Sequence, residues 1–173
     1  MDNILLVIRK IIVSFDNYSE DIDLAIDREV FALEGDLTKK ELKKLRKSSS
    51  LFVRDVVCPA LLKALKDYAL SDWFEVEAEP DGVGDSTYPE PRKIYIRYKS
   101  LFEQSALYLR PEIVLEIGSR SLIEPTETAK VKTFIAQHFP FNTDIVDKEI
   151  ITAVPQKTFL EKAFLLHELF STN

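Results

Sequence analysis

Cysteine is nearly absent from this sequence of 173 residues, and the single Cys58 excludes an intrachain disulfide and a cysteine-based zinc site. Such a chain fits the reducing cytosol, so we expect a cytoplasmic protein. Glycine is also scarce, at 4 residues, and the chain contains neither a P-loop nor the dinucleotide-binding glycine fingerprint. The two histidines, His138 and His167, are isolated, and Cys58 has no evident activating partner. Nucleophilic catalysis of the hydrolase type is therefore unsupported.

Long apolar runs are missing too, and none approaches the length of a membrane span. Arg9 and Lys10 interrupt the apolar residues 4–13, so we expect neither a signal peptide nor a membrane partner. The net charge of −6 argues against a nonspecific nucleic-acid coat protein but leaves room for a local basic patch. A magnesium-dependent enzyme that binds NTP can be acidic overall, because its carboxylates hold the metal.

The segments that are present predict one α+β domain over residues 1–173, an ordinary length for a single core. In residues 21–26, Asp21 and Asp23 share one face of a strand, and Ile22 and Leu24 share the other. Residues 4–15 fit either a helix or a buried strand, and residues 130–139 are equally ambiguous. Strands are expected at 21–26, 74–79, 93–98, 112–117 and 149–154, with an antiparallel pairing of 74–79 and 93–98.

Two helical regions are expected. The first begins at Thr38, because Thr38 and Glu41 have the spacing of a capping box. It continues through residues 51–70, where Pro59 either kinks it or starts a second helix.

The last helix is expected to begin near Thr158, where Thr158 and Glu161 repeat the capping-box spacing. Its apolar stripe consists of Phe159, Ala163, Leu166 and Phe170.

The carboxylates of Asp21 and Asp23 are the first candidates for chemistry. Two carboxylates at i and i+2 of a strand repel each other unless a cation lies between them. Oxygen ligands of this kind suit Mg²⁺, which takes one or two carboxylates plus substrate phosphates. The alternative is a strand with a solvated outer face, which an isolated Asp-x-Asp pattern favours when taken alone.

Three further features each have two interpretations. Glu116 interrupts an apolar strand, so it is either a third acidic residue of a metal site or an outward-facing carboxylate. Lys162 lies at the edge of the last helix's stripe, where it either contacts a phosphate or extends to solvent. Residues 39–47 contain six basic side chains, which form either a solvated helix surface or an RNA-phosphate contact.

Three stretches in the same order resemble the AbiEii/AbiGii nucleotidyltransferase toxins. Residues 18–26 (YSEDIDLAI) resemble the family's Ser-x-Asp-x-Asp strand. Residues 109–121 (LRPEIVLEIGSRS) look like a later strand, and residues 154–162 (VPQKTFLEK) look like the start of a helix. The resemblance implies a nucleotidyltransferase-like mixed sheet flanked by helices, and metal-dependent transfer of a nucleotide from an NTP to an acceptor.

The family implies roles for individual residues. Asp21 and Asp23 match the metal-binding pair, and Glu116 is placed as the third acidic position. Ser19 of the Ser-x-Asp-x-Asp strand, Arg120 and Lys162 are placed at the nucleotide, with Arg120 and Lys162 facing its phosphates. The implied cofactor is Mg²⁺. The implied partners are NTP, a cognate antitoxin and, for some members, a tRNA acceptor, in bacterial toxin–antitoxin or phage-defence systems.

The chain departs from this pattern at both ends. The family's Gly-Gly-Thr/Ser element before the Asp-x-Asp strand would fall in the first residues, which contain no glycine. The family also continues past the Glu-Lys helix into a further helical region, whereas this sequence stops at Asn173. We therefore expect either an active nucleotidyltransferase toxin or a catalytically inactive remnant that binds protein or RNA.

Overall fold

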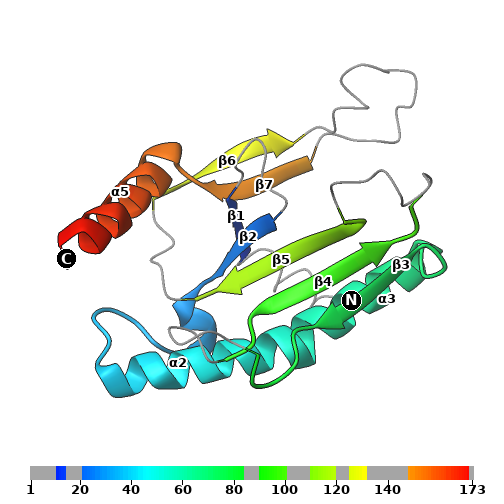
Figure 1. Ribbon diagram of the computed structural model, residues 1–173, viewed down its shortest axis with the longest axis horizontal. Helices are drawn as coiled ribbons and strands as arrows, with labels where there is room; N and C mark the ends of the chain where they lie inside the picture. The colour runs from blue at the N-terminus through cyan, green and yellow to red at the C-terminus, as the bar shows by residue number, and fades with distance from the viewer. Residues whose placement is uncertain are drawn as a thin grey trace.

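The computed structural model describes residues 11–14, 21–83, 90–100, 110–119, 125–131 and 148–171. Its centre is a seven-stranded mixed sheet with strand order β3-β4-β5-β2-β1-β7-β6 (Figure 1). The strands are β1 (Ile11–Ser14), β2 (Asp21–Ile26), β3 (Phe74–Ala78), β4 (Lys93–Tyr98), β5 (Glu112–Gly118), β6 (Thr126–Val131) and β7 (Lys148–Ala153). The helical segments are η1 (Arg28–Phe31), α2 (Lys39–Phe52), η2 (Val53–Val57), α3 (Cys58–Asp67) and α5 (Pro155–Ser171). The predicted α+β class with a mixed sheet is confirmed.

The pairing of strands follows their alternating sequences. β2 runs parallel to β5, and β1 runs parallel to β7, while the other neighbours are antiparallel. The five strands predicted from sequence are all present as β2, β3, β4, β5 and β7, each within one residue of its expected bounds. Within the ambiguous residues 4–15, residues 11–14 form the strand β1. β6 contains only the first residues of 130–139, and residues 132–139 lie outside the described part.

The hydrophobic core lies between the sheet and the helices α2 and α3, which run along one of its faces (Figure 1). Ile22 and Leu24 of β2 pack against this core, as the alternation predicts, whereas Asp23 between them is exposed. The core cluster consists of Ile26, Val53, Val57, Cys58, Ile94, Leu115 and Ile117. Burial of this apolar surface is the main favourable term that fixes which face of the sheet meets the helices.

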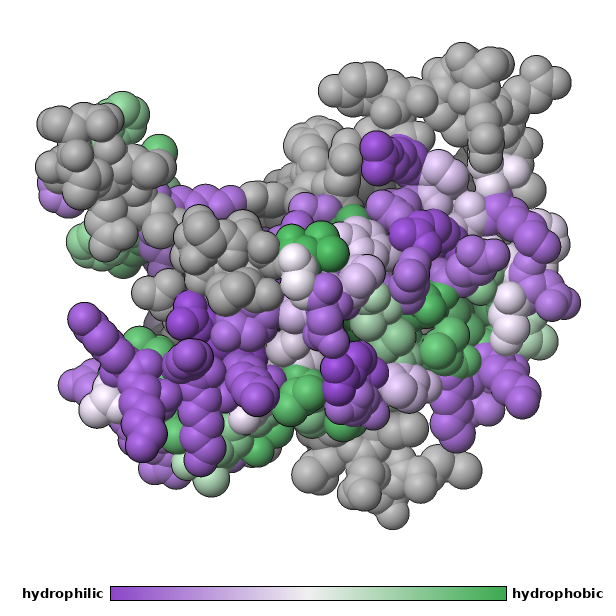
Figure 2. Space-filling model, turned by 60° about the horizontal axis from the view of Figure 1, so that its bottom comes forward, coloured by the Kyte–Doolittle hydropathy of each residue, from purple (hydrophilic) through white to green (hydrophobic). Residues whose placement is uncertain are grey.

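The start of α2 confirms the predicted capping box. The Glu41 N–H donates to Thr38 Oγ1 at 3.3 Å, and the Thr38 N–H donates to Glu41 Oε2 at 2.8 Å. Pro59 lies in the first turn of α3, which is one of the two alternatives that the sequence left open. A π-helical turn, η2, joins α2 to α3 without a break in the chain direction. The outward side of α2 carries hydrophilic side chains, which project at the lower left of Figure 2.

The last helix differs from its prediction. α5 begins at Pro155, and the N–H groups of Lys157 and Thr158 already donate to Val154 O. Glu161 forms an ion pair with Lys157 at 3.1 Å. The predicted capping box of Thr158 with Glu161 is therefore wrong, because proline has the dihedral angle of a first helical residue and starts the helix earlier.

The apolar stripe of α5 does not face the described core. Phe159, Leu166 and Phe170 are 71%, 55% and 78% exposed. Their periodicity is that of an amphipathic helix, but the side that should be buried lies at the surface in the described residues. No helix in these parts of the chain combines the length and apolarity that crossing a membrane would require.

Candidate functional site

The register of β2 and β5 brings two of the candidate carboxylates side by side. Asp23 is the direct partner of Glu116, and Asp21 is the partner of Val114. Directly paired residues lie on the same face of a sheet, roughly 5 Å apart at their Cβ atoms. This side of the sheet is opposite α2 and α3, and we call it the polar face. The residues that alternate toward it include Asp21, Asp23, Glu77, Lys93, Tyr95, Arg97, Glu112 and Glu116, with the apolar Val114 among them.

Glu116 is held by two cations. Its Oε1 lies 2.8 Å from Arg92 Nη2, and its Oε2 lies 3.4 Å from Lys93 Nζ. The three side chains are 25%, 26% and 32% exposed, so water screens them only in part. Burial alone would lower the pKa of Lys93, but the charge of Glu116 and its hydrogen bond outweigh burial and raise that pKa. Glu116 is thus held in place by two cations, at the position next to Asp23.

A second ion-pair cluster lies farther along the same face. Arg97 contacts Glu77 Oε2 at 2.7 Å and Glu112 Oε2 at 2.9 Å. Its guanidinium also lies 5.6 Å from the ring centroid of Tyr95. The hydrogen bond to Glu77, followed by that to Glu112, raises the pKa of Arg97. Arg97 is therefore shared by two carboxylates, just as Glu116 is shared by two cations.

The sequence did not single out Arg92 and Lys93, although a signal for Lys93 exists. The segment KIYIRY alternates, so Lys93, Tyr95 and Arg97 share the side opposite the buried Ile94. What the sequence lacks is the information that β4 lies beside β5 in the register that pairs Lys93 with Glu116.

The donors available for a metal fit Mg²⁺ as a two-carboxylate site. Asp21 and Asp23 present hard oxygen ligands on one face of β2, and the Asp23 side chain is exposed. Among the described residues, no three acidic, histidine or cysteine side chains converge as a metal-binding group. Substrate phosphates would then complete the coordination, which is usual for Mg²⁺. The assignment of Glu116 as a third acidic position stays a prediction.

Of the three remaining candidate residues, the structure describes only Lys162. Ser19 and Arg120 lie outside the described residues. Lys162 is exposed on α5, seven residues after Pro155. The pairings of Ser14 with Asp23 and of Val13 with Thr152 bring the end of β7, and hence the start of α5, to the end of the sheet where Asp23 lies. Lys162 is about 10 Å along the helix from that start.

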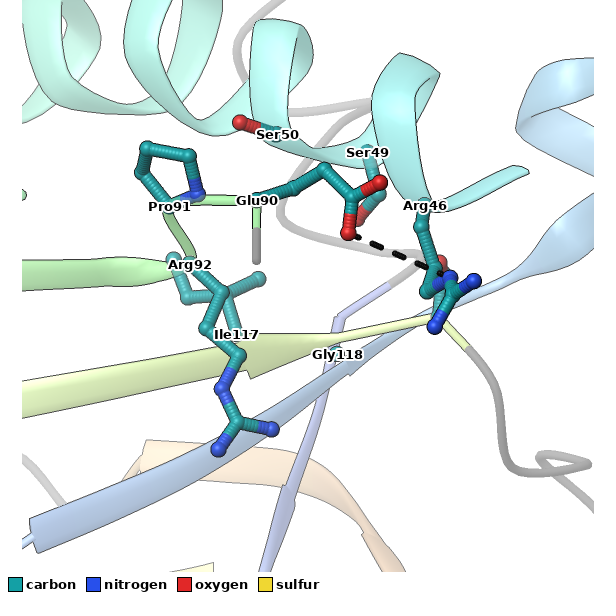
Figure 3. Close-up of a pocket in the computed structure, with 9 residues that line it drawn as sticks. Arg46, Ser49, Ser50, Glu90, Pro91, Arg92, Ile117 and Gly118 are labelled. Carbon is teal, nitrogen blue, oxygen red and sulfur yellow. Dashed lines mark ion pairs between the residues drawn. The ribbon is translucent and has the colours of Figure 1, made fainter. Parts of the chain in front are cut away.

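A small pocket lies on the other side of the sheet, between α2 and the end of β5 (Figure 3). Its volume of about 30 Å³ is far below that of a typical ligand site. Arg46 Nε and Glu90 Oε2 face each other across it at 3.9 Å, a distance longer than a hydrogen bond. In Figure 3 the Arg92 guanidinium extends away from this pair, and it meets Glu116 instead.

A family model described as "Nucleotidyl transferase AbiEii toxin, Type IV TA system" matches residues 15–172. The match includes every position of the three stretches that carry the resemblance. No curated protein and no solved structure matches the chain.

Proposed function

Because this chain belongs to the AbiEii family, the nucleotidyl transferase toxins of type IV toxin–antitoxin systems, we propose that it transfers a nucleotide from an NTP to an acceptor with Mg²⁺ held by Asp21 and Asp23. The family implies an antitoxin partner. As finer proposals, the acceptor is a tRNA and the setting is defence against phage.

The observation that supports this most is the register that pairs Asp23 with Glu116 on the polar face. Three carboxylates on two adjacent strands concentrate negative charge where a divalent cation and its phosphate ligands would bind. Bound Mg²⁺ would polarise the α-phosphate and offset charge on the leaving pyrophosphate. Asp21 and Asp23 would hold the cation, while Arg92 and Lys93 fix the position of the Glu116 carboxyl group beside it. Lys162, Ser19 and Arg120 are proposed to contact the nucleotide.

One observation favours the second candidate, an inactive relative that binds protein or RNA. Glu116 is engaged by Arg92 and Lys93, and a carboxylate in two ion pairs is a weaker metal ligand than one whose charge is unbalanced. In the active interpretation, binding of Mg²⁺ and NTP would compete with these pairs for Glu116.

Isothermal titration with each of the four NTPs, with and without Mg²⁺, separates the candidates. We expect binding that requires Mg²⁺ and is lost in Asp21→Asn/Asp23→Asn, because the variant removes both carboxylate charges. The matched control is Asp36→Asn/Asp72→Asn, which makes the same change in net charge at two exposed positions. Transfer of labelled nucleotide to tRNA is then measured with the same three proteins.

Equal NTP affinity in the Asp21→Asn/Asp23→Asn protein and its control would refute the metal pair. A folded protein that binds no NTP under any condition would support the inactive relative. Binding without transfer to tRNA would retain the NTP site and reject the proposed acceptor.

A further inference from the structure

The outer side of α2 forms a continuous basic surface. At about 100° per residue, its six cations fall within an arc of about 160°, opposite the buried Leu45 and Ser49. Their side chains make up much of the hydrophilic group at the lower left of Figure 2. We call this the basic face, and it consists of Lys39, Lys40, Lys43, Lys44, Arg46 and Lys47.

Four of the five lysines of the basic face are not balanced by carboxylates among the described residues, and the fifth, Lys44, lies near Glu41. Across the described residues, Lys39, Lys40, Lys43 and Lys47 have no ion pair, while Arg46 faces Glu90 at 3.9 Å. Elsewhere Lys63 contacts Asp67 at 2.8 Å within one helix. In a chain of net charge −6, an unbalanced cluster of this size reverses the sign of the charge locally.

A surface hollow of about 360 Å³ adjoins the basic face along the later turns of α2. Lys43 and Lys47 line it together with Ser50, Leu51 and Arg54 of the helical segments, and Asp81 and Glu90 also contribute to its lining. Arg54 is partnered by Asp55 and Asp81, so the far wall of the hollow is closer to neutral. The hollow therefore has a cationic wall and a hydroxyl donor, which are groups that contact phosphate oxygens.

The composition of the face distinguishes between two kinds of anionic partner. Protein interfaces have an apolar or aromatic centre and are depleted in lysine. The basic face has five lysines among its six residues, and Leu51, which is 40% exposed, is an apolar side chain in the adjoining hollow. A nucleic-acid backbone needs only cations and hydrogen-bond donors, because release of its counterions supplies most of the binding free energy.

We propose that the basic face of α2 binds the phosphate backbone of the RNA acceptor. This inference rests on the proposed transfer to an RNA. α2 lies on the side of the sheet opposite Asp21 and Asp23, so the RNA crosses an edge of the sheet to reach the polar face. The face anchors the acceptor through charge and selects no sequence.

The test is the binding of fluorescently labelled unfractionated tRNA, measured by anisotropy over a series of salt concentrations without NTP. For Lys43→Gln/Lys47→Gln, we expect weaker binding and a slope of log affinity against log salt that is smaller by about 2. Glutamine has nearly the helix propensity of lysine, so α2 is retained, which circular dichroism checks. The matched control is Lys63→Gln/Lys66→Gln on α3, which should keep the parent slope.

Equal slopes for the two variants, or no binding of tRNA by the parent protein, would overturn the proposal. A polyglutamate peptide that binds the basic face as strongly as tRNA would assign the face to a protein partner instead. The Mg²⁺-dependent titration with NTP is run on the same variants. If Lys43→Gln/Lys47→Gln keeps NTP binding and loses tRNA binding, the basic face binds RNA independently of the NTP site. Loss of NTP binding in Asp21→Asn/Asp23→Asn tests only the metal pair.

Discussion

On the polar face of the sheet, Arg92, Lys93 and Arg97 each meet a carboxylate, whereas on the basic face of α2 four lysines meet none among the residues described. Charges that are paired inside the molecule hold side chains in place and shape the local field. Charges without internal partners contribute little to the fold and stay available to an external anion. The difference suggests that the two faces serve different steps, with chemistry on one and anchoring on the other.

The comparison requires that α2 is docked on the sheet, and the largest predicted effect tests this. Leu45 is fully buried on the inner side of α2. Leu45→Ala removes buried methyl groups and leaves a cavity, which should lower the free energy of unfolding by about 2–5 kcal/mol. Urea unfolding measures the loss. Reaction of Cys58 with a thiol reagent gives a second reading, because burial raises the pKa of this thiol and suppresses its reactivity in the folded protein.

A loss below 1 kcal/mol in Leu45→Ala would mean that α2 is only loosely attached. The basic face would then be a mobile segment, and its geometry would say little about RNA.

The second prediction contrasts the two faces directly. Glu116→Gln leaves Arg92 and Lys93 half-buried without their counter-charge, which should cost about 2 kcal/mol, between the values for exposed and buried ion pairs. Lys43→Gln/Lys47→Gln should change stability by less than about 0.5 kcal/mol. Both are measured by urea unfolding at neutral pH. Equal costs for the two variants would remove the distinction between paired and unpaired faces.

The pH dependence of Glu116→Gln sharpens this test. The pKa of Lys93 is raised in the folded protein. Its contribution to the free energy of unfolding is therefore complete at pH values below its pKa in the unfolded chain, about 10.4. That contribution is lost as pH rises through the folded pKa. The parent protein should therefore lose stability at alkaline pH more steeply than Glu116→Gln. Parallel curves would assign the alkaline loss to other groups.

Local signals in the sequence were sufficient for the strands and for the start of α2. The alternation of Asp21 and Asp23 with Ile22 and Leu24 correctly predicted which side of β2 faces the core. It could not predict that β2 lies beside β5, because the two strands are far apart in the chain and their pairing depends on tertiary packing. The meeting of Asp23 and Glu116, and the role of Arg92, follow only from that pairing.

The candidate site shows the same limit. The sequence identified the carboxylates by residue type and spacing, yet it gave no indication that two cations hold Glu116. The apolar stripe of α5 was predicted from its period, but a period states only that one side is apolar and not what covers it.

The smallest predicted effect concerns the two threonines with the same capping-box spacing. The Thr38 side chain accepts a hydrogen bond from the Glu41 N–H. The Thr38 hydroxyl and the Thr38 N–H both donate hydrogen bonds to the Glu41 carboxylate. Thr38→Ala should therefore lower the free energy of unfolding by about 1 kcal/mol. The hydrogen bond from the Thr38 side chain, and then that from its backbone, lowers the pKa of Glu41. A carboxyl group whose pKa is lowered by folding stabilises the folded state at pH values above its pKa in the unfolded chain. This stabilisation is lost as the pH falls through its pKa in the folded protein.

The parent protein should consequently lose more stability than Thr38→Ala between neutral and acidic pH, as measured by urea unfolding at each pH. Thr158→Ala is the matched control, because Thr158 lies inside α5 with its N–H bonded to Val154 O. That substitution should change stability by only a few tenths of a kcal/mol, since alanine is the better helix former. If Thr158→Ala costs as much as Thr38→Ala, the second capping box forms in solution and α5 begins at Thr158. If neither substitution matters, the first turn of α2 is frayed, and Lys39 and Lys40 do not hold fixed positions on the basic face.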